Sequence, residues 1–139
     1  GNRAAILAET RTALQKGGTD FAHLVNVCVN GLPETELRKA VAELEADPIA
    51  AQDHEGLYNN AEALMFCGQP DAALRQLKKA IAGNYCSYPA MDKDPLFDPV
   101  RHRPEFGLLR QAGIKCQESF QIHRQQARAA IPERSENVN

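Results

Sequence analysis

The sequence predicts an all-α fold, a solenoid of antiparallel helix hairpins, on two observations. First, the chain repeats itself at an offset of 37 residues, since residues 31–48 read GLPETELRKAVAELEADP and residues 68–85 read GQPDAALRQLKKAIAGNY. Second, the apolar residues within each copy stand three and four residues apart, as on one face of a helix. Helical units that recur at such a spacing bury their apolar faces by stacking on their neighbours. This architecture is typical of binding scaffolds.

The composition is that of one helical domain. The chain has 139 residues, of which 43% are apolar and only 6% aromatic, and it contains no tryptophan. Closely packed, alanine-rich helices would produce this balance. No apolar run approaches the roughly 20 residues of a membrane span, and no secretory leader is visible. We expect one domain over residues 1–131 and a disordered polar tail over residues 132–139. Because residue 1 already lies close to a helical pattern, we also expect the chain to be a piece of a longer protein.

Three helices are expected around the first copy. The first covers residues 3–16, and a glycine pair ends it. The second covers residues 20–30, and Gly31 breaks it. The third covers residues 33–46, where Pro33 occupies a first turn that tolerates its missing N–H.

The second copy repeats this pattern more clearly. A helix is expected over residues 53–67, with Asp53 as its N-cap and Gly68 as its end. Pro70 begins the next helix, over residues 70–82. Small residues recur where the two helices of this hairpin would approach closely: Ala61, Ala73 and Ala80.

The proline-rich residues 85–104 should form an ordered, irregular strap, because a residue before proline avoids the helical region. One helical turn is expected at residues 95–98. Two capping helices should follow, over residues 104–111 and 115–130, with Gly113 as the C-cap of the first. Three apolar side chains should anchor the strap in the core: Leu96, Phe97 and Val100.

The four cysteines are Cys28, Cys67, Cys86 and Cys116. They form no C-x-x-C pair and have no histidine at zinc-finger spacing. A chain of this length can form a hydrophobic core without disulfide bonds. A free cysteine packs in such a core as a small apolar residue. We therefore expect reduced, buried thiols in a cytoplasmic protein rather than a disulfide framework.

Residues 54–87 resemble a tetratricopeptide (TPR) repeat, a 34-residue helix–turn–helix unit. The first-helix positions of that motif fall on Leu57, Asn60, Ala61 and Leu64, and the second-helix positions fall on Ala73, Leu77 and Ala80. Tyr85 stands where a proline is usual. The earlier copy, at about residues 18–50, fits the motif less well. The resemblance implies a TPR-like solenoid.

Residues 94–113, DPLFDPVRHRPEFGLLRQAG, resemble the segment that closes TPR arrays in large bacterial signalling proteins. In those proteins the array follows a serine/threonine kinase, a nucleotide cyclase or a DNA-binding domain. The matching residues are Asp94, Pro95, Phe97, Asp98, Arg101, Pro104 and Phe106. The resemblance implies a larger parent protein, and no activity in this segment.

No catalytic motif is present, so we expect no enzyme, no cofactor and no metal. Asp92, Asp94 and Asp98 are spaced like calcium ligands, but the loop lacks the central glycine and the bidentate glutamate. We interpret Asp94 and Asp98 as caps of turns before proline. A metal- or thiol-dependent site at Cys116 and His123 is the remaining alternative.

The expected binding surface is a groove lined by the first helices of the hairpins. Tyr58 could stack on a peptide and Asn59 could bind its backbone. Glu55 and Glu62 would repel a carboxylate, so the capture of acidic chain ends is not expected. The groove residues are Glu55, Tyr58, Asn59, Glu62, Met65 and Phe66, with Phe21 and Val25 from the helix over residues 20–30.

These patterns predict a non-enzymatic scaffold that binds a protein or peptide in its groove. The alternative is a regulatory or dimerising segment of a larger bacterial signalling enzyme. Its basis is a coiled-coil-like seam on the last helix that would support a homodimer, formed by Cys116, Phe120, His123, Ala127 and Ala130. Residues 101–139 are basic, with seven Lys or Arg and four Asp or Glu, but they offer no aromatic platform for nucleic acid. Neither nucleic acid nor a membrane is an expected partner.

Overall fold

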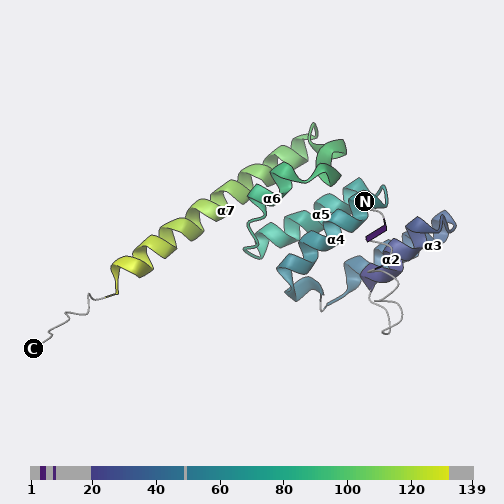
Figure 1. Ribbon diagram of the computed structural model, residues 1–139, viewed down its shortest axis with the longest axis horizontal. Coiled ribbons are helices and arrows are strands. Elements are labelled where there is room, and N and C mark those ends of the chain that lie inside the picture. Colours follow the sequence, from purple (N-terminus) through teal and green to yellow (C-terminus); the bar gives the residue numbers. More distant parts are fainter. Residues whose placement is uncertain (1–3, 6–7, 9–19, 49, 132–139) are drawn as a thin grey trace, which may run out of the picture.

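The computed structural model describes residues 4–5, 8, 20–48 and 50–131 (Figure 1). These residues are helical with no strand among them, which confirms the all-α class. The expected helix over residues 3–16 falls mostly outside the described residues, and the tail over residues 132–139 falls wholly outside them. In order, the elements are α2 (Asp20–Val29), α3 (Glu34–Ala46), the 3-10 turn η1 (Ala50–Gln52), α4 (His54–Phe66), α5 (Pro70–Ala82), α6 (Tyr88–Lys93), the 3-10 helix η2 (Pro95–Val100) and α7 (Pro104–Ala129).

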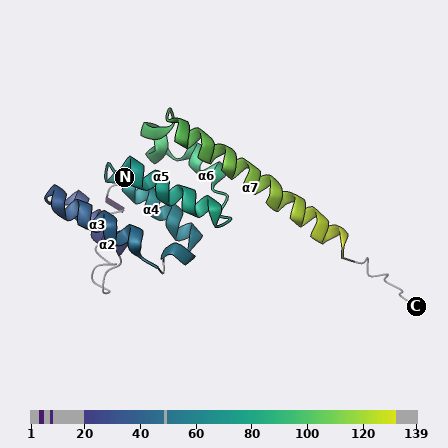
Figure 2. The same ribbon diagram turned by 180° about the vertical axis from the view of Figure 1, so that it is seen from behind.

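The helices pack as two hairpins side by side, followed by one long helix. Helix α2 packs on α3, and α4 packs on α5 (Figures 1 and 2). Helix α2 also contacts α4, and α3 contacts α5, so like elements of the two hairpins lie next to each other. Helix α7 then packs on α5 and α6. No helix in the described part is both long and apolar enough to cross a membrane.

The repeated glycines end the first helix of each hairpin in the same way. Gly31 has φ +62° and Gly68 has φ +70°, a left-handed conformation that glycine adopts at little cost. The residue after each glycine donates its N–H to a carbonyl of the last helical turn, from Leu32 to Val27 at 3.2 Å and from Gln69 to Leu64 at 2.8 Å. The repetition in sequence is therefore a repetition of backbone geometry.

One hydrophobic core runs through both hairpins and reaches the strap and α7. Ala61, Ala73 and Ala80 are fully buried between α4 and α5, as the sequence predicts for closely approaching helices. The largest fully buried apolar side chains are Leu24, Val25, Val27, Leu64, Leu77, Met91, Phe97 and Val100. Both Phe97 and Val100 come from the strap, so the strap is part of the core.

The helical turn expected at residues 95–98 is present as η2, and the strap is more regular than expected because it also contains α6. Arg101 links two backbone carbonyl groups of the strap. Its guanidinium group donates to the backbone oxygen of Met91 at 3.0 Å and to that of Asp94 at 2.7 Å. The same group lies over the ring of Phe106 at 5.6 Å from its centroid. Asp94 caps η2 by accepting from the N–H of Leu96 at 2.9 Å, which confirms its expected role.

The two expected capping helices are one continuous helix, α7, and Gly113 lies inside it rather than at a C-cap. Gly113 is buried, and a Cβ atom built on it would stand 2.7 Å from the carbonyl oxygen of Cys86. The absent side chain thus lets the loop after α5 approach α7 closely. A glycine inside a helix can serve close packing as well as termination.

Gly113→Ala is expected to destabilise the fold, although alanine normally stabilises a helix interior. The new methyl group would collide with a backbone carbonyl, which cannot rotate away as a side chain can. Gly107→Ala in the same helix is the matched control, because nothing lies within 4 Å of its Cβ position. That variant should gain about 0.5–1 kcal/mol in urea unfolding. Equal gains for both variants would contradict the close approach.

Candidate functional site

A cavity of about 410 Å³ opens between α2, α4 and η2. We call it the α2–α4 groove. Its lining residues are Phe21 and Val25 from α2, Asn59, Glu62, Ala63 and Phe66 from α4, and Leu96 from η2. Five of the eight residues expected in the binding groove therefore line this cavity: Phe21, Val25, Asn59, Glu62 and Phe66.

The lining combines half-buried aromatic rings with one exposed amide. Phe21 and Phe66 are each partly exposed, while Val25 is buried behind them. Asn59 is exposed at the edge of the groove. Leu96 was expected only as an anchor of the strap, and it also closes one side of the cavity. Its double role could not be found in the sequence, because it depends on how the strap crosses α4.

Three expected groove residues lie elsewhere. Tyr58 is buried, so it offers no stacking surface to a partner. Met65 is buried in the core, and Glu55 is exposed outside the lining of the groove. Tyr58 is covered because η2 packs on α4 and places the ring of Phe97 at 5.8 Å from that of Tyr58.

A carboxyl pair lies on the strap side of the groove. Glu62, on α4, is hydrogen-bonded to Asp94, which precedes η2. The hydroxyl of Tyr58 also donates to Oδ2 of Asp94, at 3.3 Å. Burial raises the pKa of Tyr58 well above its usual range, and the charge of Asp94 adds to the effect. Two partly buried carboxyl groups in contact favour a shared proton over two negative charges.

Burial raises the pKa of Glu62 to about 8, and the hydrogen bond and charge of Asp94 act in the same direction. At neutral pH Glu62 is therefore mostly protonated and can donate to Asp94. The pair then carries one negative charge rather than two. The repulsion of carboxylates that the sequence suggests for Glu62 is correspondingly weaker at neutral pH.

The stability of the fold is expected to fall as the pH rises from about 5 to about 9. Because the pKa of Glu62 is higher in the fold than in the unfolded chain, its stabilising contribution is full below about pH 4.5 and is lost as the pH rises through about 8. Glu62→Gln keeps a neutral side chain of the same shape at every pH. The melting temperature of this variant should exceed that of the native protein at the alkaline end only. If the melting temperatures of the two proteins changed with pH in parallel, the shared proton would be contradicted.

The aspartates of the strap have protein partners. Asp92 accepts two hydrogen bonds from Arg110, at 2.7 and 3.0 Å, which hold the pKa of its carboxyl below the usual value. Asp98 accepts from Nε of Arg101 at 2.7 Å. Within the described ranges, no three histidine, cysteine or acidic residues gather in a way that could hold a metal ion.

The expectation of free thiols is wrong, because the four cysteines form two disulfides. Cys28 is bonded to Cys67, with Cα atoms 5.4 Å apart, and Cys86 is bonded to Cys116, with Cα atoms 5.2 Å apart. The first bridge joins α2 to the end of α4, and the second joins the loop after α5 to α7. Because Cys116 is in a disulfide, it offers no free thiol for the alternative site at Cys116 and His123. The Nδ1 atom of His123 lies 2.7 Å from the carbonyl oxygen of Ser119 in the same helix.

The comparisons with known proteins give no relative. No family model matches the chain, and neither does any curated protein or solved structure.

Proposed function

We propose that the protein is a non-enzymatic scaffold of the TPR type, which binds a protein or peptide segment in the α2–α4 groove. The observation that carries this proposal is the convergence of Phe21, Asn59 and Phe66 on one cavity from two helices. Like elements of two helix hairpins lie side by side, as a repeat scaffold requires.

The lining of the groove favours one kind of ligand contact. The aromatic rings of the lining suit an apolar side chain of the partner. The amide of Asn59 could form a hydrogen bond with the backbone of the partner next to that side chain. A cavity of about 410 Å³ accommodates one or two such side chains. The single negative charge of the Glu62–Asp94 pair favours a partner without acidic residues next to this anchor.

Selection from a displayed library of linear peptides tests this proposal. Peptides that are enriched on the native protein should share an apolar anchor residue. Asn59→Ala and Phe66→Ala should each raise the dissociation constant of these peptides roughly tenfold. The control variant is Thr35→Ala, since Thr35 is exposed on α3, away from the groove. Peptides that bind both groove variants as well as the control would exclude the groove as the binding site.

The alternative function is a regulatory or dimerising segment of a larger bacterial signalling enzyme such as a serine/threonine protein kinase. It is favoured by the strap residues that resemble array-closing segments and by the long helix α7. The cytoplasmic location expected with either function rested on reduced thiols. The two disulfides remove that argument, because such bonds persist mainly in oxidising compartments. We infer that an oxidising compartment suits the protein better.

A further inference from the structure

The Glu62–Asp94 pair links two of the three walls of the α2–α4 groove. Glu62 lines the groove from α4, and Asp94 directly precedes η2, which contributes the lining residue Leu96. The strap wall is therefore joined to α4 by a hydrogen bond between two carboxyl groups. The third wall, α2, is joined to α4 by the disulfide of Cys28 and Cys67. A change in the charge of the pair thus acts on the contact between two walls of the groove.

The surroundings of Asp94 place the shared proton on Glu62. Oδ1 of Asp94 accepts a hydrogen bond from the N–H of Leu96 at 2.9 Å, and its Oδ2 accepts one from the hydroxyl of Tyr58 at 3.3 Å. Donors of this kind stabilise the ionised form of a carboxyl group. Burial has the opposite effect on Glu62 and raises its pKa to about 8. At neutral pH Glu62 therefore carries the proton and donates a hydrogen bond to Asp94.

One further titratable side chain faces Glu62, that of Tyr85 after α5. Burial raises the pKa of Tyr85, and the charges of Glu55 and Glu62 act in the same direction. On α2 the titratable residues outside the disulfide are Asp20 and His23, and the ring of His23 is bonded to a carboxylate of α3. The turn η1, which also packs on α4, has no charged residue.

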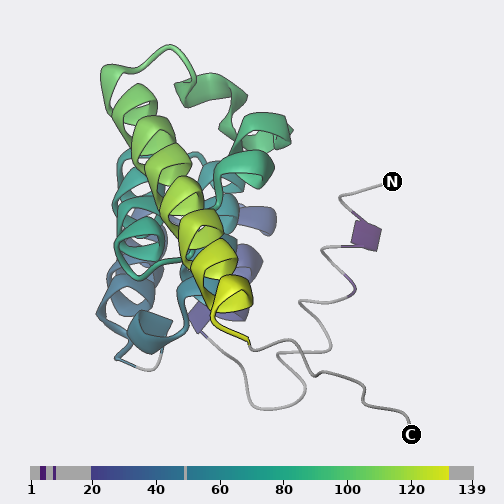
Figure 3. The same ribbon diagram turned by 90° about the vertical axis from the view of Figure 1, so that its left-hand side faces the viewer.

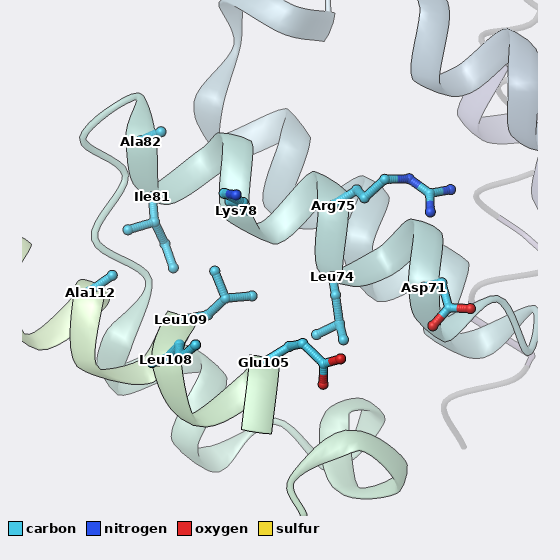
Figure 4. Close-up of a pocket in the computed structure, with 10 residues that line it drawn as sticks. All are labelled: Asp71, Leu74, Arg75, Lys78, Ile81, Ala82, Glu105, Leu108, Leu109 and Ala112. Carbon is cyan, nitrogen blue, oxygen red and sulfur yellow. The ribbon is translucent and has the colours of Figure 1, made fainter. Parts of the chain in front are cut away.

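The charged side chains of α5 and η2 have other surroundings. Figure 4 shows Asp71, Arg75 and Lys78 around a second cavity, of about 620 Å³, between α5 and α7. Helix α7 lies on the far side of the α4–α5 hairpin from α2 (Figures 1 and 3), and the two cavities share no lining residue. Lys79 is exposed, and Asp98 of η2 is bonded to Arg101. Among the described residues, Asp94 is the charged group of a neighbouring element that acts on the pKa of Glu62.

Filling the groove with an apolar group makes the ionisation of Glu62 more costly. The side chain of Glu62 is partly exposed and lines the cavity, so solvent in the groove can stabilise its charge. An apolar group in the groove displaces this solvent, and burial without a new partner disfavours the charged form of a carboxyl group. The pKa of Glu62 should therefore be higher in the occupied groove than in the empty one.

We propose that the α2–α4 groove binds an uncharged apolar group of its partner together with a proton on Glu62, so that alkaline pH releases the partner. This inference rests on the function proposed above and adds its control by pH. Because binding and protonation favour each other, the affinity is full below the pKa of Glu62 in the empty groove, about 8, and falls as the pH rises above it. A cationic group in the groove would give the reverse dependence, because it would favour the ionised pair.

The probe for this inference is a peptide from the displayed library with blocked ends and no titratable side chain. Its dissociation constant for the native protein should rise roughly tenfold from about pH 7 to about pH 9. Glu62→Gln should bind it equally well at both pH values, because the amide does not titrate. The matched control is Glu55→Gln, which removes an exposed carboxyl group of the same helix outside the lining and should keep the native pH dependence.

Calorimetry in two buffers of different ionisation enthalpy counts the protons that are taken up on binding. At about pH 8.5 the native protein should take up roughly 0.7 proton for each bound peptide, and Glu62→Gln should take up none. Circular dichroism at each pH should show unchanged helix content, so that weaker binding is not a consequence of unfolding.

The outcomes separate this inference from the proposed function. Suppose that the peptide is weakened by Asn59→Ala and Phe66→Ala but binds the native protein equally well at both pH values. The proposed function would then stand and the inference would be overturned. An affinity that rises with pH, or a native pH dependence that persists in Glu62→Gln, would also overturn the inference. A selection that yields no groove-binding peptide would overturn both.

Discussion

Reduction of the two disulfides is expected to lower the free energy of unfolding by about 4 kcal/mol for each bridge. The bridges close segments with sequence separations of 39 and 30 residues, and each restricts the unfolded chain accordingly. Domains of this size are stable by only about 5–15 kcal/mol in total. The fully reduced protein should therefore be marginally folded or unfolded at ambient temperature.

Urea unfolding with and without a phosphine reductant measures this effect. Replacing both cysteines of one bridge by serine assigns the loss to each bridge separately, while the intact bridge serves as the internal control. Protein purified without reductant should show no reactive thiol before it is unfolded and reduced. Four titratable thiols in that protein, or unfolding curves that reduction does not shift, would contradict the pairing.

Leu77→Asp is expected to unfold the protein. Leu77 is fully buried on α5, in the centre of the core that both hairpins share. The substitution removes the apolar contacts of a core leucine, which alone costs about 2–5 kcal/mol, and it places an unpaired carboxyl group among apolar side chains. The sum is comparable to the whole stability of a domain of this size.

Circular dichroism at 222 nm and thermal melting are the measurements for this variant. The matched control is Leu32→Asp, because Leu32 is 44% exposed in the turn after α2. The control should melt close to the native protein. A cooperative transition for Leu77→Asp near the native melting temperature would show that α5 does not pack in the core.

The elements of the two hairpins could be predicted from the sequence, because local signals define them. Gly31 and Gly68 mark the same left-handed turn, and Asp53 accepts the capping hydrogen bond from the N–H of Gly56 at 2.9 Å. The apolar stripe of α5 lies on the face that is buried, and the helix has the predicted bounds Pro70–Ala82. In these segments helix propensity, capping residues and the spacing of apolar residues all predict the same helices. Tertiary contacts therefore do not change the helices that the local sequence favours.

The features that the sequence could not predict depend on contacts between distant segments. No spacing rule pairs Cys28 with Cys67, since the two meet only when α2 packs on α4. Gly113 looks like a helix end until the carbonyl group of Cys86 is placed against it. Tyr58 occupies a groove position by periodicity alone, and it is buried because the strap returns across α4 to bring Asp94 to its hydroxyl.

The order of the disulfides along the chain has a consequence for biosynthesis. Each bridge joins consecutive cysteines, Cys28 with Cys67 and Cys86 with Cys116, so the two loops neither overlap nor enclose each other. The first bridge can close on a nascent chain that has emerged only as far as α4, before the other two cysteines exist to compete for it. Oxidation in the order of synthesis therefore yields the observed pairing without any reshuffling of bonds.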